Sequence, residues 1–283
     1  MAVLADHDDA TPLVLRRADH AEPSVFLPAN LLREARRQRG VPVGTVPEVC
    51  LLDPDGDIVR HLVSEGRATR SPVWACYHTN LYETEADGLR LGIIGCAVGA
   101  PFAVLVAEEL FASGCALLLS VTSAGQVATN LHLPCVILID RALRGEGTSH
   151  CYLPPSLYAE AERSLLRAAK VGLAAGGIAF QRGTTWTTDA PFRETASAIA
   201  TAEAAGVLAV EMEAAALYAF ARAMAKPVLC FALVTNQMAR IDGDFEKGPA
   251  DGAEESLRVI VAAARGIRAV RSTDPLPEAP DGG

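Results

Sequence analysis

Residues 206–223, GVLAVEMEAAALYAFARA, bring two carboxylates, Glu211 and Glu213, into a stretch that is otherwise almost wholly apolar. GVLAV is typical of a buried strand, and EAAALYAFARAM is typical of a helix. Glu213 therefore falls near a helix N-terminus, where the helix dipole and free N–H groups favour an ionised carboxylate. Because a buried carboxylate without partners is costly, each of the two needs donors from the protein or from a ligand. The alternatives are a helix cap with a salt bridge, or a binding site for the hydroxyl groups of a sugar.

Similar joints between a strand and a helix recur along the chain. Apolar runs predict strands at 48–53, 89–98, 115–121, 134–140, 176–182, 206–212 and 227–236. Amphipathic segments predict helices at about 28–38, 57–65, 101–113, 155–172, 192–205, 213–225 and 250–269. Several strands are apolar throughout, as expected for a sheet covered by helices on both sides. We therefore expect a three-layer α/β/α domain with a central mixed sheet.

The ends of the chain differ from its middle. Residues 1–22 are polar and 271–283 are rich in Pro, Asp and Gly, so we expect a mobile N-terminal segment and a disordered tail. Residues 23–270 show no linker and no repeat, which indicates a single catalytic domain.

Composition excludes some functions. A net charge of -9 argues against a nucleic-acid or membrane partner, and no window is long and apolar enough for a membrane span. The seven cysteines are scattered without a CxxC pair, and with the six histidines they show no metal-ligand spacing. We expect a cytoplasmic protein with reduced cysteines, a small-molecule ligand and no metal.

In α/β sheets, ligands bind where strands end. After the first strand, GDIVR offers Gly56 and Arg60 as an anion site, although a turn with a surface arginine is an alternative interpretation. After the third strand, Thr122 to Gly125 (TSAG) offer hydroxyls and backbone donors that also suit an anion. At the end of the seventh strand, the Asn236 amide carries the donor and acceptor that would read the edge of a nucleobase, unless it only forms a turn.

In the segment GTTWTTDAPFRET, residues 183–195, Trp186 and Phe192 flank two threonines and an aspartate. These aromatics predict a stacking wall for a planar ligand, and a place in the core is the alternative. The anion site suits a phosphate, the carboxylates suit a sugar, and the stacking wall and the amide suit a base. Together these features predict a site for all three groups.

With these motifs in view, residues 23–270 resemble the purine nucleoside phosphorylase and uridine phosphorylase superfamily. In that family the VEMEA segment lies under the ribose, which implies that Glu213 holds the 2′- and 3′-hydroxyls, that Met212 packs on the sugar and that Glu211 stands beside them. GDIVR and SVTSAG resemble the phosphate-binding segments of the family, which implies that phosphate is bound by Gly56, Arg60, Thr122 and Ser123. The loop at 183–195, the glycine that ends SVTSAG and the segment FALVTNQ imply base-binding roles for Trp186, Phe192, Gly125 and Asn236.

The chain also departs from the family pattern. Ser120 stands where the family has a phosphate-binding Arg, and Leu27 stands near the place of an N-terminal His. Thr195 and Ser197 stand near the positions of a uracil-reading Gln and Arg. Asn236 replaces the acid of hexameric purine enzymes, but it matches the Asn with which trimeric purine phosphorylases bind a 6-oxopurine.

The resemblance implies a nucleoside phosphorylase that needs no cofactor and cleaves a purine nucleoside or uridine with inorganic phosphate, giving free base and ribose 1-phosphate. Glu213 and Asn236 would be the catalytic residues, the second stabilising the departing base. The family also implies a homo-oligomer, a dimer or a trimer of dimers, in which a neighbour completes each site, and His78 is a candidate for that role. A hydrolytic nucleosidase and a non-catalytic nucleoside- or nucleotide-binding protein are the alternatives.

Overall fold

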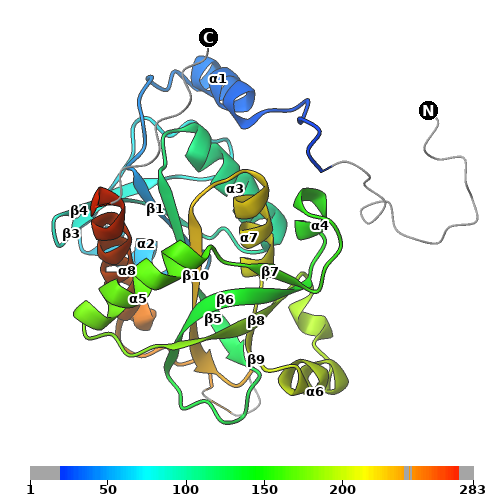
Figure 1. Ribbon diagram of the computed structural model, residues 1–283. Helices are drawn as coiled ribbons and strands as arrows, with labels where there is room; N and C mark the ends of the chain where they lie inside the picture. The colour runs from blue at the N-terminus through cyan, green and yellow to red at the C-terminus, as the bar shows by residue number, and fades with distance from the viewer. Residues whose placement is uncertain (1–19, 239–241, 243, 274–283) are drawn as a thin grey trace, which may run out of the picture.

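A mixed β-sheet runs through the molecule, and helices surround it (Figure 1). The structure is a computed structural model that describes residues 20–238, 242 and 244–273. Its strands are β1 (Val49–Asp53), β2 (Ala68–Arg70), β3 (Tyr82–Ala86), β4 (Leu89–Gly95), β5 (Leu117–Gln126), β6 (Cys135–Gly145), β7 (Tyr158–Glu160), β8 (Gln181–Thr188), β9 (Val207–Glu211) and β10 (Val228–Asn236). The helices are α1 (Pro28–Arg39), α2 (Asp57–Ser64), α3 (Ala100–Ala112), α4 (Ser149–Tyr152), α5 (Arg163–Ala175), α6 (Ala196–Ala204), α7 (Ala214–Ala223) and α8 (Ala253–Thr273), with short 3-10 helices at Pro191–Arg193 and Pro249–Gly252.

Half of the sheet closes on itself. Strand β10 pairs with β6 on one side and with β5 on the other, and β6, β8, β9 and β5 pair in that order, so five strands form a ring. From β5 the sheet continues as an open extension through β1, β4, β3 and β2. Both parallel and antiparallel pairs occur, which confirms the predicted mixed sheet surrounded by helices. Closure could not be predicted from alternating strands and helices, because it depends on which strands pair.

The packing of α5 on α8 is unusually tight. A Cβ on Gly172 would lie 2.1 Å from the carbonyl oxygen of Ala262, and one on Gly266 would lie 2.4 Å from that of Ala168. The two helix backbones therefore touch through glycine, and only the absence of side chains permits this distance. Elsewhere in the molecule, α7 packs against α3, α4 and β6.

Several element boundaries differ from the prediction. The helix expected at 155–172 begins only at Arg163, because 158–160 pair with β6 as the short strand β7. The strand expected at 176–182 begins at Gln181, since α5 continues to Ala175 and turns through Gly177. Helix α6 begins at Ala196, where the Thr195 hydroxyl accepts a hydrogen bond from the Ala198 N–H. The short elements β2, β3, β7 and α4 were missed altogether.

The predictions about the two ends of the chain fall mostly on residues outside those described. Helix α8 continues to Thr273 and so includes the first residues of the predicted tail. Within the described residues, no helix combines the length and apolar character needed to cross a membrane.

Candidate functional site

The ends of β1, β4, β5, β9 and β10 meet at one edge of the sheet, and most of the predicted site residues lie there. Glu213 precedes α7 and is only 2% exposed. Its Oε1 accepts a hydrogen bond of 2.7 Å from the N–H of Gly99, the residue before α3. Its Oε2 is buried and has no hydrogen-bond partner among the described residues. Burial and the nearby charge of Glu211 raise the pKa of Glu213 to about 8. Because Oε2 has no partner, a ligand can donate hydrogen bonds to it.

Glu211, at the end of β9, has all its hydrogen bonds inside the protein. One oxygen accepts from the hydroxyls of Thr185 and Thr187 at 3.1 and 2.5 Å. The other accepts from the N–H groups of Glu213 and Ala214, both at 2.7 Å. Burial raises the pKa of Glu211, while these hydrogen bonds act in the opposite direction. Glu211 thus caps α7 and fixes the backbone of Glu213, and it has no free acceptor directed at a ligand.

The loop after β1 is held by Asp53. Its carboxylate accepts hydrogen bonds from the N–H groups of Gly56 and Val59, and burial raises its pKa to about 6. Gly56 has φ of 76°, and a Cβ there would lie 2.6 Å from Cys96 Sγ and 2.8 Å from Arg60 Nη1. This loop therefore needs glycine for its conformation as well as for space.

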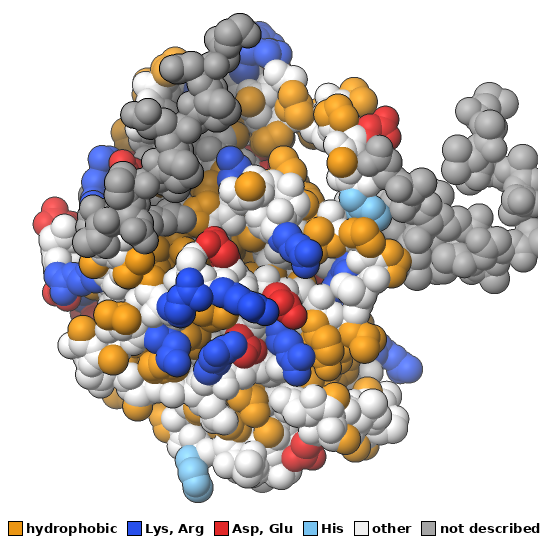
Figure 2. All heavy atoms as spheres, viewed as in Figure 1, with side chains coloured by type: hydrophobic (Ala, Val, Ile, Leu, Met, Phe, Trp, Pro, Cys, Tyr) orange, Lys and Arg blue, Asp and Glu red, His pale blue; other side chains and the backbone are white. Residues whose placement is uncertain are grey.

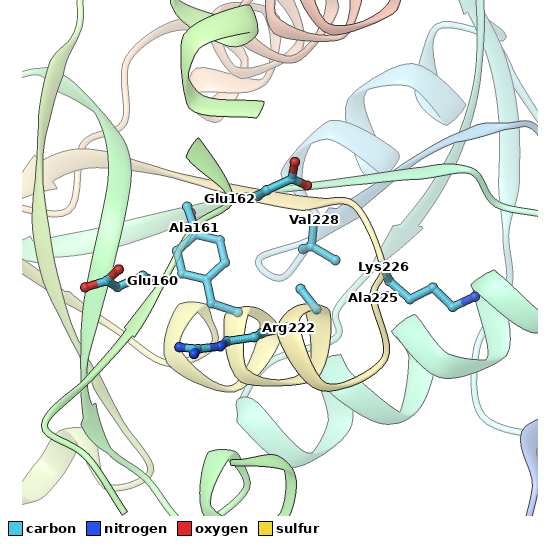
Figure 3. Close-up of a pocket in the computed structure, with 9 residues that line it drawn as sticks. Glu160, Ala161, Glu162, Arg222, Ala225, Lys226 and Val228 are labelled. Atoms are coloured by element: carbon cyan, nitrogen blue, oxygen red, sulfur yellow. The ribbon is translucent and has the colours of Figure 1, made fainter. Parts of the chain in front are cut away.

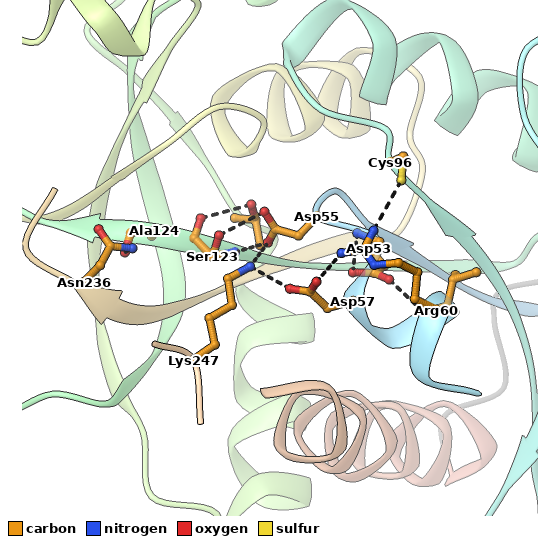
Figure 4. Close-up of polar contacts among 12 residues, drawn as sticks. Asp53, Asp55, Asp57, Arg60, Cys96, Ser123, Ala124, Asn236 and Lys247 are labelled. Atoms are coloured by element: carbon orange, nitrogen blue, oxygen red, sulfur yellow. Dashed lines mark hydrogen bonds and ion pairs between the residues drawn. The ribbon is translucent and has the colours of Figure 1, made fainter. Parts of the chain in front are cut away.

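The residues predicted to hold phosphate do not form an open anion site. The Arg60 guanidinium is largely exposed and pairs with Asp57 on its own helix. Ser123 donates from its N–H at 2.8 Å and from its hydroxyl at 3.0 Å, both to the carboxylate of Asp55. The Thr122 hydroxyl donates to the carbonyl oxygen of Ser123. An internal carboxylate thus occupies the donors that an anion would use (Figure 4).

Lys247 lies beside this carboxylate. Its Nζ is 2.6 Å from Asp57 Oδ2 and 3.6 Å from Asp55 Oδ2, and its side chain is mostly buried. Burial alone lowers the pKa of Lys247, but the hydrogen bond to Asp57 and the charges of Asp55 and Asp57 raise it overall. Ser120, at the position of the missing arginine, is buried within β5 and supplies no charge. The cations of the site are therefore already balanced by aspartates.

Asn236 ends β10 directly opposite Gly125 of β5. Its Oδ1 accepts from the Met238 N–H at 3.0 Å, and its Nδ2 makes only a long 3.5 Å contact with the Ala124 carbonyl oxygen. The amide therefore retains a donor for a ligand. A Cβ on Gly125 would lie 2.6 Å from Met238 Cγ, so the absence of a side chain there leaves room for Met238.

The two predicted aromatic residues do not form a wall in the single chain. Trp186 packs beside buried residues such as Val207 and Val210, while its neighbours Thr185 and Thr187 contact Glu211. The Phe192 side chain is 99% exposed. Met212 is half-buried between the two glutamates, and His78 is exposed near Phe102.

One group of side chains has metal-ligand geometry outside this site. Ligand atoms of His61, Glu65 and Glu254 lie within 4.8 Å of one another. Arg67 forms ion pairs with both glutamates. It supplies the charge balance that a metal ion would give, so the group is explained as an ion-pair network.

A cavity of about 530 Å³ lies away from the candidate site, between the C-terminal end of α7 and the start of α5. Its lining includes Tyr218, Arg222, Lys226 and Val228 (Figure 3). Lysine and arginine side chains gather near the middle of the face shown in Figure 2, where Figure 1 shows β6 and β8. No predicted site residue lines this cavity.

The chain belongs to the phosphorylase superfamily, whose family model matches residues 48–271. No curated protein sequence matches it. Among solved structures, a uridine phosphorylase from Vibrio fischeri ES114 aligns with a TM-score of 0.66 at 21% identity, over 80% of this chain and 93% of that one. An AMP nucleosidase from Bacteroides thetaiotaomicron VPI-5482 aligns with a TM-score of 0.67 at 22% identity, over 87% and 99%. The fold is thus shared by a phosphorylase and a hydrolase, and the predicted family is confirmed.

Asp55 and Lys247 were missed by sequence reasoning. Asp55 lies in the turn DPDGD, two residues after β1, where its proximity to the glycine-containing loop was a usable signal. Lys247 lies 190 residues from Asp57, and no local pattern connects them.

Proposed function

We propose that the protein hydrolyses the N-glycosidic bond of a nucleoside, with water and not inorganic phosphate as the acceptor. The observation that carries this proposal is the Asp55 carboxylate on the N–H and hydroxyl of Ser123. Phosphate and a carboxylate are both anions, so phosphate would have to displace Asp55 to use these donors. A water molecule, in contrast, can donate to Asp55 where the carboxylate already lies.

Each remaining site residue has a role in this reaction. Glu213 binds the vicinal hydroxyls of the ribose through its unpartnered oxygen, and Met212 packs against the sugar. Glu211 positions Glu213 through the backbone. Asn236 donates from its amide to the base, beside Gly125. Asp55 accepts the proton of the attacking water as a general base, a role for carboxylates in many enzymes.

In the reaction, the bond between C1′ and the base nitrogen breaks, and its electron pair leaves with the base. The water oxygen bonds to C1′, and its proton passes to Asp55 and from there to solvent, while the departing base takes up a proton from solvent. The ribosyl group carries positive charge in the transition state, which Asp55 and an ionised Glu213 stabilise electrostatically. No cofactor is required. By family likeness we further propose a homo-oligomer in which a neighbour completes the base and ribose contacts, with Phe192 and His78 available on the surface.

Phosphorolysis is the second candidate function. It is favoured by the nearness of Gly56, Arg60 and Lys247, because two cations beside a left-handed glycine loop suit an anion once Asp55 moves. In that case Arg60 would leave Asp57 and bind phosphate together with Ser123.

One experiment separates these functions. The purified chain is incubated with inosine, guanosine, adenosine and uridine in phosphate-free buffer and again with about 10 mM phosphate, roughly ten times the upper end of usual KM values. The sugar product is then identified. Equal cleavage in both buffers, with free ribose as product, supports hydrolysis. Cleavage that requires phosphate and gives ribose 1-phosphate overturns it. Nucleoside binding without turnover in either buffer indicates a binding protein.

A further inference from the structure

A second cavity, of about 260 Å³, adjoins the cavity of about 530 Å³ described above. The two share Glu160 and Ala161 as lining residues, so they lie side by side. Pockets for small organic ligands usually measure roughly 300–1,000 Å³, and the two cavities together are of this size. None of the residues predicted for the candidate site lines either cavity, so they form a separate place for a ligand.

Three arginines line the smaller cavity: Arg141 on β6, Arg163 at the start of α5 and Arg182 on β8. Two of them are held through Nε. Arg141 Nε donates to Thr184 Oγ1 at 2.9 Å, and Arg182 Nε donates to Asp140 Oδ2 at 2.8 Å. The terminal nitrogens of both guanidinium groups make no hydrogen bond within the described part of the chain. Arginine binds phosphate oxygens with such paired donors.

The backbone of β6 directs two consecutive side chains into this cavity. Its pairing with the parallel strand β8 skips Asp140, which has no partner residue on β8 and forms a β-bulge. Side chains normally alternate between the two faces of a strand, yet Asp140 and Arg141 both line the cavity. Bulges are rare between parallel strands, and they often redirect a side chain beside a functional site.

The charge of the smaller cavity is only partly balanced within the protein. Of its three arginines, only the one bound to Asp140 has a carboxylate partner. The Arg141 guanidinium lies 4.4 Å from the centre of the Tyr158 ring, and neither Arg163 nor the exposed Glu160 forms an ion pair with any described residue. No side chain caps α5, and the helix dipole disfavours a cation such as Arg163 at its first position. An anion in this cavity would neutralise the unpaired arginines.

The larger cavity has a more apolar wall (Figure 3). Its uncharged lining residues are Ala161, Tyr218, Ala221, Ala225 and Val228. The small alanine side chains leave space that a planar ring can fill, and such rings bind in apolar pockets. The Glu160 carboxylate, which lines both cavities, makes no hydrogen bond with a described residue and can accept from hydroxyl groups. Phosphate donors, a hydroxyl acceptor and an apolar space therefore follow one another.

We propose that the two cavities bind a nucleotide. Its phosphate lies on Arg141, Arg163 and Arg182, its ribose hydroxyls donate to Glu160, and its base fills the apolar cavity. The basic side chains gathered over β6 and β8 in Figure 2 surround this place, although the net charge of the chain is -9. This inference concerns binding alone and does not depend on the proposed function, because the two sites share no residue.

The test is isothermal titration calorimetry with AMP. All variants are built on Glu213→Gln, which removes the proposed ribose ligand of the candidate site and so isolates binding in the cavities. Arg163→Ala should weaken AMP binding by about 10-fold or more, the effect of losing one charge-assisted hydrogen bond. Arg163 is exposed, so its loss should leave the midpoint of thermal unfolding unchanged. Arg167→Ala, one turn further along α5 and outside both cavities, is the matched control and should bind AMP as its parent does.

A further variant tests the apolar cavity. Ala221→Leu fills part of its space, so it should weaken binding of AMP and leave binding of inorganic phosphate unchanged. Inorganic phosphate should itself bind more weakly than AMP, because it makes no contact with the larger cavity.

Two results would overturn the proposal. If AMP does not bind, or if Arg163→Ala binds it as tightly as its parent, the arginines do not form a phosphate site. If inorganic phosphate binds as tightly as AMP, or if Ala221→Leu has no effect on AMP, the larger cavity holds no base and the ligand is not a nucleotide. Neither result affects the proposed hydrolysis, which is measured as nucleoside cleavage by the wild-type protein.

Discussion

The Asp55 carboxylate accepts two hydrogen bonds from one residue, Ser123, at 2.8 Å from its N–H and 3.0 Å from its hydroxyl. Members of the superfamily that use phosphate are expected to place that anion on the same hydroxyl. A phosphate ion entering this site would compete with Asp55 for the same donors, and this competition is open to direct measurement.

Asp55→Ala tests the competition. Loss of the proposed general base should reduce phosphate-independent nucleoside cleavage by about 100-fold or more. The same change frees the donors of Ser123 and leaves Lys247 without one of its aspartates, so inorganic phosphate should bind the variant measurably. Isothermal titration calorimetry with phosphate, run on the wild-type chain and the variant, measures the second effect.

Asp87→Asn serves as the control for these measurements, since Asp87 is exposed and pairs with Arg265 away from the site. It should leave both cleavage and phosphate binding as in the wild-type protein. If Asp55→Ala cleaved nucleosides at the wild-type rate in phosphate-free buffer, Asp55 would have no catalytic role.

The pKa of Glu213 predicts a pH dependence of stability. Because this pKa is about 8 in the folded protein, compared with an ordinary value of 4.5, the folded state holds the proton more tightly than the unfolded state. The resulting stabilisation is complete below about pH 4.5 and is lost as the pH rises through about 8. The free energy of unfolding, measured with urea at pH 5 to 9, should therefore fall less in Glu213→Gln than in the wild-type protein.

A ribonucleoside should alter that behaviour. Two hydroxyl donors on the free oxygen of Glu213 favour its ionised form, so nucleoside affinity should rise between pH 6 and 9. Glu213→Gln should bind nucleosides weakly with little dependence on pH. An unchanged affinity in this variant would remove Glu213 from the ribose site.

Glu211 should act mainly on stability. Glu211→Ala leaves four donors without an acceptor, and a buried donor without a partner costs about 1–3 kcal/mol. We expect the variant to lose roughly 3 kcal/mol or more of unfolding free energy. Thr185→Val, which removes one of the four donors and keeps the side-chain size, should cost about 1.5–3 kcal/mol.

If Glu211 bound the sugar directly, Thr185→Val would leave KM for nucleosides unchanged and Glu211→Gln would raise it strongly while the protein remained stable. If Glu211 instead only caps α7, both Thr185→Val and Glu211→Gln should lower the stability of the protein, and KM should change little in the protein that remains folded. Thermal unfolding followed by circular dichroism, together with KM for the same variants, distinguishes the two roles.

The contact between α5 and α8 gives a prediction that does not depend on function. Gly172→Ala places a methyl group 2.1 Å from the Ala262 carbonyl oxygen, so the helices must separate. Overpacking of this kind costs about 1–3 kcal/mol. Gly177→Ala, at a positive φ with open space around it, should cost only about 1 kcal/mol from backbone strain. Equal losses in the two variants, measured by urea unfolding, would contradict the close contact.

The sequence predicted the parts of the fold that depend on local patterns. The apolar runs of β1, β9 and β10 lie within a residue or two of their predicted bounds, and Gly56 lies in the loop predicted for it. Strand β7 was missed because three residues carry no periodic signal, and only pairing with β6 makes them a strand. Ring closure was missed for the same reason, since it is a property of partners and not of single segments.

In the candidate site, too, some features could be predicted from local sequence and others depend on which strands pair. Glu213 and Asn236 were predicted from their place at strand ends, and the structure adds their contacts. Asp55 and Ser123, which are 68 residues apart, become neighbours only through the pairing of β1 with β5. The competition between a carboxylate and an anion therefore has no signature in either segment alone.

The closed ring has a consequence for how base preference can change. Strand β10 is paired on both sides, with β5 and with β6, so sliding it by one residue would break two ladders at once and turn the Asn236 side chain to the opposite face. Asn236, the residue proposed to contact the base, is therefore fixed in position along the sheet. A change of base preference that involves β10 therefore has to come from exchanging side chains on this strand, because the backbone itself cannot shift by one residue.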